Sequence, residues 1–162
     1  MSHNGLSVPR PDETGPEAPA EAVPSSSRAV LVVEDDQAIS TSLSEALREE
    51  GFAVTTAGNG RDALELLRAG QPPSAIILDL MMPVMDGWDF RHAQLHDPAL
   101  KDIPVVVVTA AGFSAETIRM QFGNVVMIPK PVAYLDLLDA LDRACPQKMI
   151  DSDKKTTYGS SP

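Results

Sequence analysis

The chain has 162 residues, enough for one domain with extensions, and its 43% hydrophobic but only 4% aromatic residues predict an aliphatic core. The formal net charge of −10 argues against a nucleic-acid-binding surface, because nucleic-acid backbones are also negative. The single cysteine, Cys145, excludes an internal disulfide framework, and the lack of a signal peptide or a long apolar run predicts a cytoplasmic protein without membrane insertion.

The two ends of the chain differ in composition from its centre. Residues 1–27 are rich in proline among small and polar residues, and residues 146–162 are mostly polar. Neither end has enough large apolar side chains to form a core. We therefore predict a disordered leader over residues 1–27, one domain over residues 28–145 and a disordered tail over residues 146–162. Neither end is long enough for an output domain, which argues against a DNA-binding transcription factor.

Between these ends, apolar runs alternate with helical patterns. The apolar runs predict strands over residues 29–33, 52–57, 75–78, 104–108 and 124–128. Helical patterns follow them over residues 37–50, 61–69, 87–96, 115–122 and 132–144. Asp36, Asp86 and Ser114 suit helix N-caps, and Gly51 and Gly70 suit the positions just after helix ends. Five consecutive βα units predict an α/β fold in which helices cover both faces of a parallel sheet.

The helical patterns also predict which helix faces are buried. Apolar residues three or four positions apart mark the inner stripe of an amphipathic helix. We expect inner stripes formed by Ile39, Leu43, Ala46 and Leu47, by Ala63, Leu64 and Leu67, and by Leu135, Leu138 and Leu141.

Polar side chains stand at the ends of four predicted strands. Glu34 and Asp35 follow the first strand, Asp79 ends the third, and Thr109 and Lys130 follow the fourth and fifth. In a doubly wound parallel sheet, the carboxyl ends of all strands lie along the edge where ligands bind. Each residue alone has an ordinary interpretation as a turn cap, a strand-end hydroxyl or a surface cation. Together they predict a site.

The three carboxylates of this set need a counter-charge. Closely spaced carboxylates repel one another, and oxygen ligands without cysteine favour a hard cation, most simply Mg²⁺. A metal that bridges Asp35 and Asp79 would leave one Asp79 oxygen free to attack a phosphoryl group. Thr109 and Lys130 are placed to hold the phosphoryl oxygens, so the pattern predicts an aspartyl-phosphate site.

Four ordered motifs carry a family resemblance. They are VLVVEDD at the first strand, ILDLMMPVMDG at the third, VVVVTA at the fourth and PKP after the fifth. Through these motifs, residues 28–144 resemble a bacterial two-component response-regulator receiver domain. The resemblance implies a flavodoxin-like (βα)5 fold with strand order 2-1-3-4-5. It also implies a stand-alone signalling protein that acts on an unknown downstream protein by direct contact.

The resemblance assigns the phosphoacceptor and the metal ligands. Asp79 would accept a phosphoryl group from the phosphohistidine of a histidine kinase or of a histidine phosphotransfer protein. Asp35, Asp79 and the backbone carbonyl of Met81 would bind Mg²⁺ directly, and Glu34 would bind it through water.

The resemblance also assigns the groups that hold the phosphoryl oxygens. Thr109, with its neighbour Ala110, is similar to the switch hydroxyl of the family. Lys130, typically joined to Pro131 by a cis peptide bond, would pair with the phosphoryl group. One position departs from the family pattern, because Met127 stands where a tyrosine or phenylalanine commonly couples phosphorylation to the output surface.

Other functions stay open at this point. A receiver domain acts on no free substrate, so we expect a signalling protein and not an enzyme, with at most self-catalysed phosphotransfer and autodephosphorylation. The main alternative is a pseudo-receiver that binds partners independently of phosphorylation, which Met127 keeps open. A hydrolase of the haloacid-dehalogenase type would need a second aspartate where Met81 stands. The helix expected within residues 111–123 looks short for the common dimerisation surface, so we expect a monomer or a weak dimer.

Overall fold

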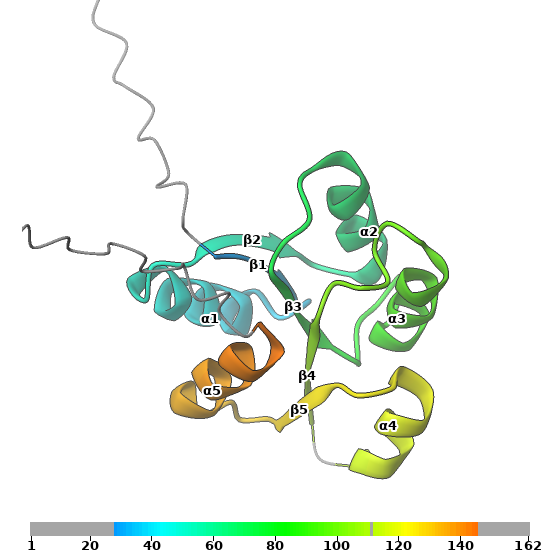
Figure 1. Ribbon diagram of the computed structural model, residues 1–162. Helices are drawn as coiled ribbons and strands as arrows, with labels where there is room; N and C mark the ends of the chain where they lie inside the picture. The colour runs from blue at the N-terminus through cyan, green and yellow to red at the C-terminus, as the bar shows by residue number, and fades with distance from the viewer. Residues whose placement is uncertain (1–27, 111, 146–162) are drawn as a thin grey trace, which may run out of the picture.

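A computed structural model describes residues 28–110 and 112–145, so the predicted leader and tail lie outside the described residues. Strands and helices alternate through this part of the chain (Figure 1). The strands are β1 (Ala29–Val33), β2 (Ala53–Ala57), β3 (Ala75–Asp79), β4 (Val105–Thr109) and β5 (Val126–Pro129). The helices are α1 (Gln37–Glu49), α2 (Gly60–Ala69), α3 (Gly87–His96), α4 (Ala115–Phe122) and α5 (Tyr134–Ala144). None of these helices combines the length and the apolar composition that crossing a bilayer requires.

The five strands form one parallel sheet in the order β2-β1-β3-β4-β5. This arrangement confirms the predicted α/β class and the flavodoxin-like strand order. Every residue of β3 and β4 is buried, because both strands lie inside the sheet and helices cover both of its faces. From β1 the chain adds β2 on one side of the sheet and β3, β4 and β5 on the other, so the strand order reverses between β1 and β3. At such a switch point the loops after neighbouring strands diverge and leave room for a ligand.

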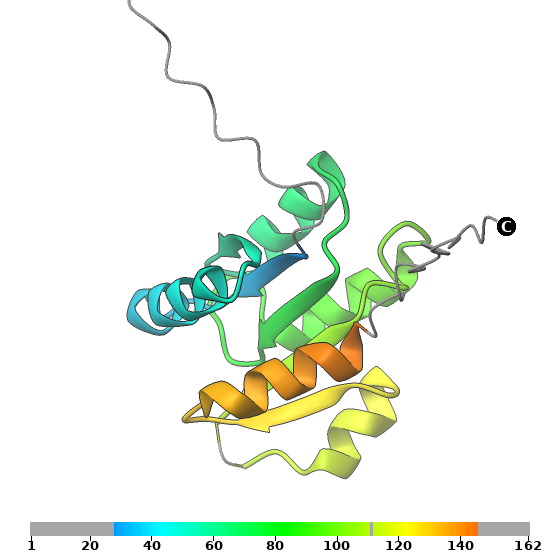
Figure 2. The ribbon, with the colours of Figure 1, turned by 60° about the vertical axis from the view of Figure 1, so that its left-hand side comes forward.

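The helices divide into two layers. α1 and α5 cover one face of the sheet, and α2, α3 and α4 cover the other (Figure 1). In the view of Figure 2, α5 lies beside β5 at the edge of the sheet. The core between α1, α5 and the sheet is aliphatic except for one aromatic ring, Phe52. The opposite core also contains the buried aromatic rings of Phe90 and Phe122.

The helix ends follow the predicted signals. Asp36, Asp86 and Ser114 accept hydrogen bonds from backbone N–H groups in the first turns of α1, α3 and α4. Asn59 caps α2 in the same way. Gly51 follows α1 with a φ of +85°, a left-handed conformation that favours glycine at this position.

Two of the three predicted inner stripes differ from the structure. On α1, the buried residues are Ser40, Ser44 and Leu47, while the predicted Ile39 and Leu43 are only half-buried. On α5, the buried residues are Leu137, Ala140 and Leu141, and the predicted Leu135 is 75% exposed. Both helices carry apolar residues on a wide arc, and the position of each helix over the sheet decides which part of the arc is covered. The stripe on α2 is confirmed.

The boundaries of β5 also differ from the prediction. The strand was expected over residues 124–128, but it runs from Val126 to Pro129. Gly123 ends α4 with a φ of +75°, and the chain needs two further residues to enter the sheet. Pairing with β4 then sets the register, with Val106 opposite Val126 and Thr109 opposite Pro129.

An aromatic contact joins α3 to α4 and to the loop before it. The indole ring of Trp88 lies 4.6 Å from the ring of Phe122 and 5.6 Å from that of Phe113, measured between ring centroids. Both pairs are tilted, as aromatic pairs in protein cores prefer. The position of α4 is therefore fixed against α3 by ring packing.

A buried polar network lies in the same joint. Arg91 donates hydrogen bonds to Oε1 of Gln94 at 2.8 Å and to the carbonyl of Phe122 at 3.1 Å. Gln94 in turn donates to the carbonyls of Leu100 and Ile103. Burial lowers the pKa of the Arg91 guanidinium. This guanidinium binds the carbonyl of Phe122, the last residue of α4. The network links α3, the end of α4 and the segment that enters β4.

Candidate functional site

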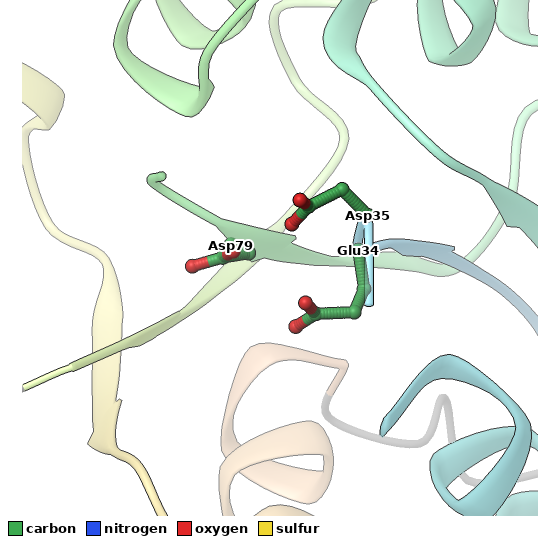
Figure 3. Close-up of side chains that lie close together, drawn as sticks. All are labelled: Glu34, Asp35 and Asp79. Carbon is green, nitrogen blue, oxygen red and sulfur yellow. The ribbon is translucent and has the colours of Figure 1, made fainter. Parts of the chain in front are cut away.

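Three carboxylates meet at the carboxyl edge of the sheet. Glu34 and Asp35 leave the end of β1, and Asp79 is the last residue of β3. Since Val33 pairs with Leu78, Glu34 and Asp79 stand at the same level of adjacent strands. One oxygen from each of the three carboxylates lies within 4.8 Å of the others, and the carboxylates face a common space (Figure 3). Glu34 and Asp79 are each only 4% exposed, whereas Asp35 is exposed to solvent.

Lys130 supplies the cation of the site. Its Nζ lies 2.7 Å from Oε2 of Glu34 and 3.4 Å from Oδ2 of Asp79. The backbone places it there, because the Lys130 N–H donates to the carbonyl of Thr109 at 2.8 Å and the bond to Pro131 is cis, as predicted. Four of the predicted site residues are therefore brought together, and their roles stay predictions.

The environment shifts two pKa values in this cluster. Burial raises the pKa of Glu34, the Lys130 hydrogen bond opposes this effect, and the negative charge of Asp79 adds to it. Burial alone would lower the pKa of Lys130, but its hydrogen bond to Glu34 and the charges of both carboxylates raise it overall. One ammonium faces three carboxylates, so negative charge is left over when all of them are ionised. The cluster is electrostatically suited to a further cation.

The remaining predicted residues surround this cluster. The hydroxyl Oγ1 of Thr109 is buried and has no hydrogen-bond partner among the described residues, while its neighbour Ala110 is exposed. A buried hydroxyl without a partner costs free energy, so Thr109 retains a donor for a ligand. Met81 is 61% exposed, and its N–H donates to Oδ1 of Asp79 at 3.3 Å. Met127 is half-buried and packs against the core formed with α2, α3 and α4.

Two features of the site were missed in the sequence. The N–H of Asp36 donates to Oε1 of Glu34 at 3.2 Å, so the residue that caps α1 also holds a carboxylate. A Cβ at Gly87 would lie 2.3 Å from the carbonyl oxygen of Asp79, so this glycine allows the close approach of α3 to the end of β3. In the sequence, Gly87 directly after Asp86 has the ordinary appearance of a turn, which gives no indication of such a contact.

An apolar groove borders the site on the side of α1. It has a volume of about 610 Å³ and is lined mainly by Ala38, Ile39, Leu43, Pro131 and Val132. Lys130 lines the groove and also contacts the carboxylate cluster, so this residue is common to both.

The donor set fits a hard divalent cation. All of the candidate ligand atoms are carboxylate oxygens, two of the three carboxylates are buried, and the cluster has excess negative charge. Mg²⁺ prefers oxygen ligands and is commonly held by one or two carboxylates together with waters. The exposed side of Asp35 leaves space for those waters.

The titration of Glu34 should make stability depend on pH. The raised pKa of folded Glu34 means that its stabilising contribution is complete below the unfolded value of 4.5 and is lost as the pH rises through the folded pKa. In urea unfolding without divalent cations, we expect this fall in the wild type and a flatter profile in Glu34→Gln. Mg²⁺ at about 100 times its Kd should restore about 2.7 kcal/mol to the wild type. Parallel pH profiles for the two proteins would contradict this account of Glu34.

Comparisons with known proteins agree with the fold and the arrangement of the motifs. The family model of the response regulator receiver domain matches residues 30–142. The response regulator MprA of Mycolicibacterium vanbaalenii is 38% identical over 110 residues, which are 67% of this chain and 46% of MprA. The chain thus spans about half the length of the curated relatives it matches.

Two solved structures illustrate the likeness in three dimensions. The chemotaxis protein CheY4 of Vibrio cholerae is 30% identical with a TM-score of 0.66, over 73% of this chain and 98% of that chain. The N-terminal domain of a response regulator receiver protein from Methanoculleus marisnigri is 32% identical with a TM-score of 0.60, over 74% of this chain and 98% of that chain.

Proposed function

This chain belongs to the response regulator receiver domain family of two-component systems, and from that membership we propose that Asp79 is its phosphoacceptor. The observation that supports this role most directly is the arrangement around Asp79. Its buried carboxylate lies beside Asp35, Glu34 and the Lys130 ammonium. Thr109 ends β4, the strand that pairs with β3. This set provides a nucleophile, cation ligands and donors for phosphoryl oxygens within one small volume.

The proposed reaction is a phosphoryl transfer from a phosphohistidine. A carboxylate oxygen of Asp79 forms the new P–O bond, the P–N bond to the donor imidazole breaks, and the imidazole nitrogen keeps the electron pair. The Lys130 ammonium lies 3.4 Å from Oδ2 of Asp79, and the Thr109 hydroxyl, at the end of the neighbouring strand, has no partner among the described residues; both would donate to the phosphoryl oxygens. Lys130 would exchange part of its contact with Glu34 for a contact with the phosphoryl group.

The acidic residues would hold Mg²⁺ in this proposal. Asp35, Asp79 and the backbone carbonyl of Met81 would bind it directly, and Glu34 would bind it through water. Bound Mg²⁺ offsets the negative charge that the phosphoryl group brings to the carboxylates. Glu34 is already bonded to Lys130, which favours an indirect role for its carboxylate.

Receiver domains of response regulators interact with histidine kinases. We propose a histidine kinase or a histidine phosphotransfer protein as the donor for this chain. The apolar groove shares Lys130 with the carboxylate cluster, so a donor helix seated there would bring its phosphohistidine toward Asp79. We further propose a signalling role through contact with a downstream protein, with no free substrate, as a monomer or a weak dimer in the cytoplasm.

Small phosphodonors test this proposal without the cognate kinase. We expect acetyl phosphate or phosphoramidate to add one phosphoryl group to the wild-type protein in the presence of Mg²⁺, and the gain to vanish in EDTA. Intact-mass spectrometry measures the gain, and peptide mapping identifies the labelled residue. A protein that binds Mg²⁺ at the acidic cluster but gains no mass would instead be a pseudo-receiver that acts independently of phosphorylation.

A further inference from the structure

Two histidines form a pair on the exposed face of α3. His92 and His96 are four positions apart, so they lie one above the other on the helix surface. Both are exposed, and their ring centroids are 4.3 Å apart. The opposite side of the helix carries its buried residues, Gly87, Phe90, Arg91 and Gln94. The imidazole pair therefore faces solvent and not the core.

One hydrogen bond orients the second ring of the pair. Nδ1 of His96 lies 2.7 Å from the carbonyl oxygen of His92. A carbonyl can only accept, so Nδ1 carries the hydrogen and, in the neutral ring, Nε2 keeps a free lone pair. Metal-binding histidines usually donate their other ring nitrogen to a carbonyl or a carboxylate in this way, which fixes the tautomer and the direction of the ligand atom.

The pair differs in chemistry from the carboxylate cluster. Imidazole nitrogen suits copper, nickel and zinc, whereas carboxylate oxygen suits magnesium. Two imidazoles at positions i and i+4 of a helix present two nitrogen ligands on one face, the spacing used by helical zinc sites. Asp89 adds an exposed carboxylate on the same face, three positions before His92. The described domain thus offers one site of oxygen donors and one of nitrogen donors.

We propose that His92 and His96 chelate a divalent late transition metal, with water completing its coordination. Affinity should follow the order of imidazole complexes, strongest for Cu²⁺ and weaker for Ni²⁺ and Zn²⁺. Mg²⁺ should not compete, because it binds nitrogen ligands poorly and prefers the acidic cluster. The inference stands on α3 alone and is independent of phosphoryl transfer at Asp79.

Calorimetric titration with Ni²⁺ tests the site. The chain contains three histidines, so a His3→Asn background leaves only the pair, and saturating Mg²⁺ occupies the oxygen site. We expect one Ni²⁺ per chain, and paramagnetic broadening should affect the ring signals of His92 and His96 first. Either His92→Asn or His96→Asn should weaken binding about 100-fold, because a chelate becomes a single contact.

A double variant provides the matched control. Asp89→His combined with His92→Asn keeps two imidazoles on the exposed face but separates them by seven positions, too far to chelate one ion. We expect it to bind Ni²⁺ as weakly as the single variants. Equal affinity in the background protein and in all three variants, or no Ni²⁺ binding by the background protein, would overturn the proposal.

Discussion

Asp79→Asn should abolish phosphoryl labelling by acetyl phosphate while leaving the domain folded. The amide of asparagine has no carboxylate oxygen to form the acyl phosphate. Asp79 is the last residue of β3, and neither Glu34 nor Asp35 occupies that position. The change also removes a negative charge beside Glu34, whose pKa that charge raises, so the pKa of Glu34 should move back toward its usual range. The contact with Lys130 at 3.4 Å is lost at the same time. We expect stability within about 1 kcal/mol of the wild type.

Intact mass with Mg²⁺ and acetyl phosphate measures the first effect, and urea unfolding measures the second. Asp139→Asn is the matched control, since it removes the same charge from the exposed surface of α5, where Asp139 pairs with Arg143. Labelling should be normal in this control. A phosphoryl group that still appears on Asp79→Asn would mean that the acceptor is another residue.

Gly87→Ala should lower the free energy of unfolding and slow the labelling of Asp79, because the new methyl group overlaps backbone atoms. Its Cβ would lie 2.3 Å from the carbonyl oxygen of Asp79 and 2.7 Å from Cα of Leu80. Both are backbone atoms, so no side-chain rotation can relieve the contact, and the chain after β3 must shift. We expect a loss of about 3 kcal/mol in the free energy of unfolding, the upper part of the usual range for overpacking. Labelling of Asp79 should slow at least about tenfold, because its carboxylate moves with the backbone.

Gly58→Ala separates this local clash from a general effect of replacing glycine. A Cβ at Gly58 meets nothing within 4 Å, so this control should lie within about 0.5 kcal/mol of the wild type and label normally. Urea unfolding and the time course of labelling give both comparisons. Similar losses in the two variants would show that the close approach of Gly87 to Asp79 is not the cause.

The sheet and the members of the site could be predicted because both depend on local patterns. Each strand of a buried parallel sheet is a short apolar run, and the residue that follows it must stand at the common carboxyl edge. Asp79, Thr109 and Lys130 are therefore expected at the same edge of the sheet although they are far apart in the chain. Glu34 and Asp35, which lie close to Asp79, were also found by their position at a strand end, without knowledge of any contact.

The details that escaped prediction depend on packing between elements. Leu135 and Leu137 are two positions apart and point to different sides of α5, so the sequence offers two competing apolar stripes, and the placement of α5 over the sheet buries the one that contains Leu137. Arg91 and Gln94 have the sequence character of surface residues, yet both are buried because they satisfy carbonyls at the end of α4 and before β4. Such partners lie on other elements and leave no local signal.

The ring contact between α3 and α4 gives this molecule a built-in optical probe. Trp88 is the only tryptophan of the chain, and its indole ring contacts Phe122, the last residue of α4, and Phe113 in the loop before α4. Indole emission responds to the polarity and contacts around the ring, so fluorescence excited near the red edge of protein absorption reports on this joint alone. Any displacement of α4 can therefore be followed in real time on the unlabelled protein.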